Sequence, residues 1–144
     1  MANVPDALRD FAHRYTAAWC SQDPGSVAAH YSPSGSLSIN GGNPAVGRIA
    51  IAGVAREFMT AFPNMQLIMD RLIAKGDRTE YHWTLLGTNL GPGGTGHRVR
   101  ISGVEEWKIG RDGLIEESQG RYDSALYQHQ LEHGVEERFG INPD

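Results

Sequence analysis

The chain is 144 residues long, which is the size of one domain and leaves no room for a second, cofactor-binding domain. Its 13 Lys and Arg residues and 17 Asp and Glu residues give a formal net charge of −4, and no stretch concentrates the basic residues on one face. This charge pattern argues against binding to a phosphate backbone, so we expect no nucleic-acid partner.

The sequence also lacks membrane, targeting and metal-binding signals. No window holds the roughly 18 uninterrupted apolar residues of a membrane span, and residues 1–6 have neither the basic start nor the apolar run of a signal peptide. The one cysteine, Cys20, cannot form an internal disulfide, and no Cys or His partner stands at the spacing of a zinc site. We therefore expect a cytoplasmic protein with no membrane partner and no metal.

Three helices are expected in the first half of the chain. Apolar residues at steps of three and four predict a helix over residues 5–20. An Asp-Pro pair at positions 23 and 24 is typical of a helix start and opens a short second helix. A short strand is expected over residues 36–40, and helical spacing then predicts a third helix over residues 48–62, which the next proline ends.

The second half of the chain predicts a sheet, because the apolar period changes from 3.6 to 2 after residue 63. Four strands are expected, joined by short turns that make successive strands antiparallel neighbours, over residues 65–74, 78–90, 98–109 and 114–122. Residues 124–133 then predict a last helix. Helices followed by a long meander indicate an α+β fold, with the helices gathered against one face of a curved sheet.

Short segments spread along the chain resemble one known family. They are Ala18-Trp19 with Asp23, Gly47-Arg48, Ala61-Phe62-Pro63-Asn64, Gly87-Thr88-Asn89, Asp112 to Glu117, and Asp123 before Gln130-Leu131. Their order resembles the SnoaL-like polyketide cyclase branch of the nuclear-transport-factor-like, ketosteroid-isomerase-like superfamily. The resemblance implies a cone-shaped α+β barrel, in which a strongly curved, mostly antiparallel sheet wraps around three N-terminal helices and a short C-terminal helix follows. It implies one domain over residues 1–135 and a polar tail over residues 136–144.

Strand alternation predicts which side chains enter the pocket that the family encloses. On the strand over residues 98–109, we expect Glu105 and Trp107 inside, because the opposite phase would bury two charged neighbours. On the preceding strand, the family pattern turns His82 inward. Symmetric pairing about the intervening loops places His82 beside Glu105 and opposite Arg71, where the carboxylate would raise the pKa of the imidazole. A one-residue slip would reverse these assignments, and His82 as a hydrogen-bonded sheet residue without chemistry stays an open alternative.

The sequence departs from the family pattern at functional positions. The catalytic acid of the cyclase and epoxide hydrolase members aligns with Gly120, which has no side chain to donate a proton. The histidine of the cyclases aligns near Glu105, and the histidine that commonly follows Gly-Thr in the wider family is Asn89 here. Asp123 matches a widespread family aspartate, but its place at a helix start predicts an N-cap.

Two functions are compatible with these residues. The first is a cofactor-independent isomerase, dehydratase or cyclase in which His82 and Glu105 are catalytic. Tyr122, Asn89 or Thr84 would donate a hydrogen bond to a developing oxyanion. The second is a non-catalytic protein that has lost the family's acid and binds a ligand in the same pocket, and the structural alternative is a dimerisation module with no ligand. In every case we expect a homodimer through the sheet and no cofactor, and the first two functions take a small hydrophobic or aromatic ligand. The predicted binding residues are Trp19, Tyr31, Met59, Phe62, Thr84, Trp107 and Tyr122.

Overall fold

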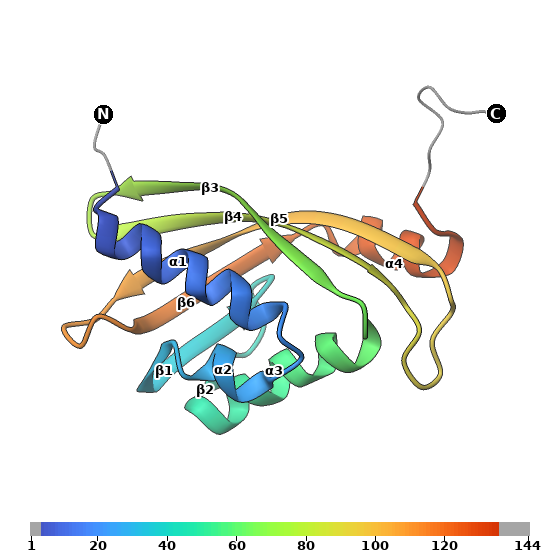
Figure 1. Cartoon of the computed structure of the whole chain (residues 1–144), viewed down its shortest axis with the longest axis horizontal. Helices are drawn as coiled ribbons and strands as arrows, with labels where there is room; N and C mark the ends of the chain where they lie inside the picture. Colours follow the sequence, from blue (N-terminus) through green and yellow to red (C-terminus); the bar gives the residue numbers. More distant parts are fainter. Residues whose placement is uncertain (1–3, 136–144) are drawn as a thin grey trace.

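The computed structural model describes residues 4–135 and confirms the α+β fold (Figure 1). Its elements, in chain order, are α1 (Asp6–Trp19), α2 (Pro24–Ala28), β1 (Tyr31–Ile39), β2 (Ala45–Val46), α3 (Arg48–Ala61), β3 (Gln66–Lys75), β4 (Arg78–Thr88), β5 (Arg98–Ile109), β6 (Ile115–Tyr122) and α4 (Ser124–His133). Each predicted helix and strand is present. The strand expected over residues 36–40 is longer and starts at Tyr31, and the two-residue strand β2 was not predicted. The predicted tail over residues 136–144 lies outside the described residues.

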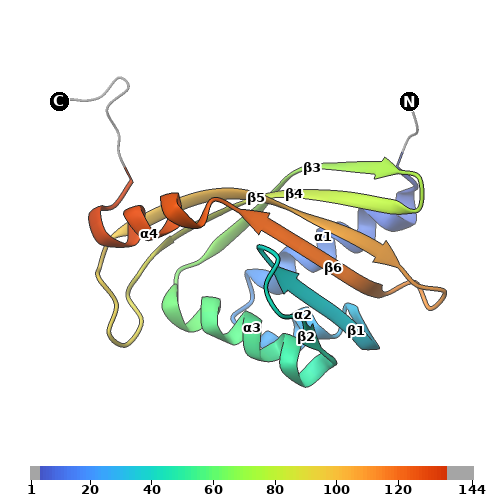
Figure 2. The ribbon, with the colours of Figure 1, turned by 180° about the vertical axis from the view of Figure 1, so that it is seen from behind.

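The strands form one sheet in the order β2-β1-β6-β5-β4-β3. All neighbouring strands are antiparallel except β1 and β6, which are parallel. The second half of the chain is therefore the predicted meander, extended at its β6 edge by the first strand. Helix α1 crosses one face of the curved sheet, while the opposite face of β4, β5 and β6 is open to view for most of its length (Figure 2). Within residues 4–135, no helix is long and apolar enough to cross a membrane.

An aromatic cluster fixes α1 on the inner face of the sheet. The predicted apolar stripe of α1 is buried and includes Phe11, Tyr15 and Trp19. From the sheet, Tyr81 and Trp107 stack with their ring centroids 4.8 Å apart, and the Tyr15 ring meets Trp107 edge-on at 5.2 Å. Such large rings supply most of the apolar surface of a small core. Their packing holds the hydroxyl of Tyr15 over the centre of the sheet.

The register of β4 against β5 differs by one residue from the prediction. Glu105 pairs with Tyr81, and His82 pairs with Val104. The predicted pair His82 and Glu105 is therefore wrong, because the slip turns His82 to the outer face of the sheet and Tyr81 to the inner face. This phase is the more favourable one, since it buries an aromatic ring instead of an imidazole. The predicted pairing of Arg71 with His82 is confirmed, although β3 carries a bulge just before it.

Two aspartates begin helices, as their positions predict. The Asp23 carboxylate accepts a hydrogen bond from the backbone N–H of Gly25 at 3.1 Å, and that of Asp123 accepts one from the N–H of Leu126 at 3.0 Å. Each bond satisfies a backbone donor that has no partner within its own helix.

The capping role of Asp123 predicts an effect on stability. We expect Asp123→Ala to lower the free energy of unfolding by about 1 kcal/mol, measured by urea titration, because the carboxylate bonds only to its own helix among the described residues. An unchanged free energy of unfolding would contradict this role.

Candidate functional site

Glu105 is a buried carboxylate on the inner face of β5, as its strand phase predicts, and it is only 7 % exposed. Its Oε1 atom accepts three hydrogen bonds: from the Tyr15 hydroxyl at 2.9 Å, from Trp107 Nε1 at 2.8 Å and from the Ser118 hydroxyl at 2.9 Å. Its Oε2 atom accepts one longer bond from the same tyrosine, at 3.2 Å. Oε2 is therefore the oxygen that has lone-pair capacity left for a proton or a ligand.

Three different elements hold this carboxylate. Tyr15 reaches it from α1, Trp107 lies two residues along the same strand, and Ser118 comes from β6, where it pairs with Trp107. The hydroxyls of Tyr15 and Tyr31 lie 2.9 Å apart, so Tyr31 donates to Tyr15 when Tyr15 donates to Glu105. Buried polar groups are stable when every member of the network has a partner. The network fixes where the carboxyl group sits and how it is turned.

Burial raises the pKa of Glu105 above its ordinary value near 4.5, because the charged form loses its water. Hydrogen bonds from Trp107, Ser118 and Tyr15 stabilise the charge and lower the pKa, but the net direction is upward. Burial, followed by the nearby Glu105 charge, also raises the pKa of the Tyr15 hydroxyl well above its usual range. Glu105 is thus the group of this network that can gain and lose a proton under ordinary conditions.

The raised pKa predicts a specific pH dependence of stability. Above the ordinary carboxyl pKa, the folded state binds more protons than the unfolded state until the folded pKa is passed. The stabilising contribution of Glu105 is therefore complete at low pH and is lost as pH rises through the folded pKa. We expect the free energy of unfolding of the wild type to fall relative to that of Glu105→Gln, in urea titrations from about pH 4 to pH 8. A wild type that instead gains stability relative to Glu105→Gln as pH rises would show that the pKa is lowered.

An apolar cavity of about 60 Å³ adjoins the carboxylate. It is lined by Trp19, Leu37, Ile39, Phe58, Met65, Leu67, Trp83, Leu85, Glu105, Gly120 and Tyr122. Gly120 pairs directly with Glu105, and a Cβ atom at that position would lie 3.7 Å from Glu105 Cγ. Gly120, which the family resemblance aligns with the catalytic acid, is therefore part of this cavity wall. Among the residues that line the cavity, Glu105 is therefore the one with a carboxyl group.

The predicted binding residues divide between the cavity wall and the core. Trp19 and Tyr122 line the cavity with Glu105. The other apolar ones are buried in the core and are not among its lining residues; they are Tyr31, Met59, Phe62 and Trp107. Trp107 nevertheless acts on the site, because its indole N–H donates to the carboxylate.

The predicted polar residues of β4 do not reach the cavity, and this part of the prediction is wrong. His82 lies on the outer face, where its Nε2 atom is 3.0 Å from Glu80 Oε1. On the same face, the Thr84 hydroxyl donates to Asp70 at 2.6 Å. Asn89 is also occupied, since its amide donates to the carbonyl of Ala61 and accepts from the next loop. The register slip between β4 and β5 accounts for His82 and Thr84.

The sequence prediction missed the two hydroxyls that bind Glu105. Tyr15 lies on the apolar stripe of α1. A hydrophobicity pattern counts it as a large aromatic residue and gives no sign of a role for its hydroxyl group. Ser118 follows from alternation on β6, because it occupies the inner phase with Gly120, but a lone serine carries no signal of its own. Trp83 was missed because the predicted phase of β4 placed it outside. Knowing the true register of β4 against β5 would have found Trp83.

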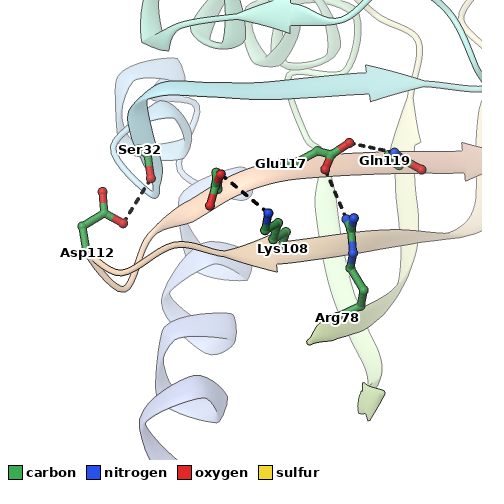
Figure 3. Close-up of polar contacts among 7 residues, drawn as sticks. Ser32, Arg78, Lys108, Asp112, Glu117 and Gln119 are labelled. Atoms are coloured by element: carbon green, nitrogen blue, oxygen red, sulfur yellow. Dashed lines mark hydrogen bonds and ion pairs between the residues drawn. The ribbon is translucent and has the colours of Figure 1, made fainter. Parts of the chain in front are cut away.

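The outer face of the sheet carries charge pairs that are separate from the cavity. Arg78 lies 3.2 Å from Glu117 (Figure 3), and Lys108 lies 3.9 Å from Glu116. Exposed pairs of this kind contribute little to stability and are satisfied by one another. Within residues 4–135, no three His, Cys, Asp or Glu side chains lie close enough together to hold a metal ion. Among the described residues, Glu105 thus differs from these charged groups because it is buried and lines the cavity.

A comparison with protein-family models matches residues 12–118 to the SnoaL-like domain. The chain belongs to the SnoaL-like family. The matched segment contains Glu105 and its partners Tyr15 and Ser118, so the network lies inside the SnoaL-like domain. No protein of curated function matches the sequence.

Solved structures share the SnoaL-like fold at low identity. AclR, a hydroxylase-like protein of Streptomyces galilaeus, is 25 % identical with a TM-score of 0.73, covering 85 % of this chain and 93 % of its own. A SnoaL-like, polyketide-cyclase-type protein of Jannaschia sp. CCS1 is 13 % identical with a TM-score of 0.78, covering 94 % and 99 %. A ketosteroid-isomerase-like protein of Catenulispora acidiphila, solved with trimethylamine, is 16 % identical with a TM-score of 0.74, covering 90 % and 94 %. These similarities confirm the cone fold.

Proposed function

We propose that this SnoaL-like protein binds a small hydrophobic or aromatic molecule beside Glu105 and moves a proton on it without a cofactor, as an isomerase, dehydratase or cyclase. One observation carries the proposal: an apolar cavity has a buried carboxyl in its wall, and burial raises the pKa of that carboxyl. A carboxyl group facing an apolar space costs free energy unless it is used or paired, and perturbed groups in cavities are typical of functional sites.

The size of the cavity sets a condition on the ligand. An apolar cavity of about 150 Å³ holds benzene, whereas this one measures about 60 Å³. An aromatic ligand must therefore widen it. Phe58 and Tyr122 are half-buried members of the lining, so they can turn outward with less loss of packing than the buried ones. Ligand binding is expected to move one or both of these side chains and to leave Glu105 in place.

The proposed step is a proton transfer at a carbon next to a carbonyl. The ionised Glu105 takes the proton through Oε2, the electrons of the C–H bond form a C=C bond, and the carbonyl oxygen becomes an enolate. The protonated Glu105 then returns the proton to the same carbon or to a conjugated one. Such positioned acid–base groups contribute rate factors of about 10² to 10⁴. The other side chains of the network hold Glu105 and do not themselves exchange protons with the ligand.

Gly120 favours a second function, non-catalytic binding of the same class of molecule. The family's acid is missing at that position, and His82 lies on the outer face, so Glu105 acts without a second proton-transfer side chain. A binding protein would return its ligand unchanged. The two functions share the cavity and differ only in turnover.

Exchange of carbon-bound hydrogen for deuterium tests the catalytic function. The protein is incubated in D₂O with 1-indanone and with a panel of other cyclic ketones, and loss of the α-hydrogen signal is followed by NMR. We expect exchange above the buffer rate, in proportion to protein concentration. Exchange at the buffer rate for every ketone, under conditions where 1-indanone saturates the protein, would overturn the catalytic function in favour of binding alone.

We extend the proposal to a homodimer through the outer face of the sheet, in the cytoplasm. The support is that, within residues 4–135, no helix crosses the centre of this face (Figure 2), and that Val104 lies on β5 between His82 and Arg121 of the two neighbouring strands. Sedimentation velocity should give twice the mass of one chain, and Val104→Arg should give the mass of one chain because it brings like charges together. A wild type that sediments as one chain would contradict the dimer.

A further inference from the structure

Two buried donors near Glu105 have no hydrogen-bond partner. Among residues 4–135, Trp19 Nε1 and Trp83 Nε1 are the buried side-chain nitrogen or oxygen atoms without one. Buried polar atoms are almost always paired, so each exception calls for a physical reason. Both of these side chains line the cavity that contains Glu105, whereas the third indole, that of Trp107, donates to Glu105.

The two unpaired indoles differ in their surroundings. The Trp19 indole lies close enough to the Tyr15 hydroxyl to lower that group's pKa, although it does not reach hydrogen-bond geometry. The hydroxyl residue packed against Trp83 is Tyr122, with ring centroids 6.1 Å apart, and burial alone raises the pKa of Tyr122. No hydrogen bond to Trp83 Nε1 is present among the described residues. Its N–H is the donor that the protein itself leaves unused.

The neighbouring strand is shaped to hold a full indole at position 83. Trp83 pairs with Gly103 on β5. A Cβ atom at Gly103 would come within 2.4 Å of Trp83 Cζ2 and within 2.5 Å of the carbonyl oxygen of Arg121. Any larger residue at position 103 would therefore displace the ring. The absence of a side chain there leaves room for the indole to lie against the strand.

We propose that Trp83 donates a hydrogen bond from its indole N–H to an oxygen of the bound molecule, which makes it the residue that selects carbonyl-bearing ligands over plain hydrocarbons. The inference rests on the proposed function, because it uses the same cavity. An indole N–H can donate but cannot accept, so it can only be satisfied by an acceptor such as a ketone, quinone or enolate oxygen. Glu105 and Trp83 then address two atoms of one ligand: the carbon that loses the proton and the oxygen that gains charge.

A matched pair of ligands tests the role of Trp83. 1-Indanone and indane share one ring skeleton and differ in the carbonyl group. In a cavity without a donor, the ketone would bind more weakly, because its oxygen loses water without a replacement. We expect the wild type to bind 1-indanone about threefold to tenfold more tightly than indane, measured by NMR titration. In Trp83→Phe, which keeps an aromatic ring but has no N–H, the ratio should fall to about one or below.

The indole signals of the unmodified protein give a second measurement that needs no variant. In ¹H–¹⁵N spectra, 1-indanone should move the Trp83 Nε1–H signal downfield, and indane should not. Equal affinities for the two ligands and an unmoved Trp83 signal would overturn this inference while leaving the cavity in place. Failure of both ligands to bind would overturn the proposed function and this inference together. Retained ketone preference in Trp83→Phe would assign the donor to another residue and contradict the role of Trp83.

Discussion

Replacing Glu105 with glutamine should slow α-hydrogen exchange of 1-indanone by a factor of about 10² to 10⁴, the range that a positioned acid–base group supplies. Glutamine has nearly the same shape, and its carbonyl oxygen can still accept hydrogen bonds from Tyr15, Trp107 and Ser118. It cannot bind the transferred proton. The dissociation constant of 1-indanone, measured by NMR titration, should change by less than about threefold, since the apolar wall of the cavity is intact.

Glu106→Gln provides the matched control for this experiment. Glu106 is the next residue on β5, points to the outer face and pairs with Glu80, so its removal changes the net charge equally without touching the cavity. Exchange by this variant should match the wild type. Full exchange activity in Glu105→Gln, or an equal loss in both variants, would contradict the role of Glu105.

Replacing Trp107 with alanine should lower the free energy of unfolding by about 3 to 5 kcal/mol, the usual cost of removing a buried aromatic ring. The Trp107 side chain is fully buried, stacks on Tyr81 and meets the edges of Phe11 and Tyr15. Its loss also removes one donor from the buried carboxylate of Glu105. Urea titration measures the change.

Ile49→Ala is the control for Trp107→Ala. Ile49 is apolar but 93 % exposed, so its truncation should change stability by no more than about 0.5 kcal/mol. A loss of less than about 1 kcal/mol in Trp107→Ala would show that this ring is a replaceable pocket wall and not part of the core. The prediction thus separates the sequence-based assignment of Trp107 to ligand binding from the packing found in the structure.

Local patterns were enough to predict the helices, the four-stranded meander and the α+β class. The stripe that contains Phe11 and Trp19, the change to a period of two after Pro63, and the short turns between strands each depend on residues close together in the chain. The parallel pairing of β1 with β6 was not predicted, because it joins segments about 80 residues apart and leaves no local signal. The extension of β1 back to Tyr31 was missed for the same reason, since its pairing partner Ile115 is equally distant.

The sequence predicted a site residue correctly only where the alternation of one strand determines which face of the sheet its side chain is on. Glu105 follows from the alternation of β5 alone, and that prediction holds. His82 depended on the register between two strands, and a shift of one residue in the connecting loop moved it to the other face. Tyr15 depended on where α1 crosses the sheet, which no local pattern encodes. A sequence therefore predicts most reliably the burial of those residues whose orientation depends on a single helix or strand.

A crystal structure of the protein soaked with 1-indanone tests most directly whether the cavity beside Glu105 is the ligand site. We expect the ring between Trp19 and Trp83, its α-carbon within reach of Glu105 Oε2 and its carbonyl oxygen on the Trp83 N–H, with Phe58 or Tyr122 turned outward. A ligand bound elsewhere, with the cavity closed and Glu105 bonded only to Tyr15, Trp107 and Ser118, would contradict it.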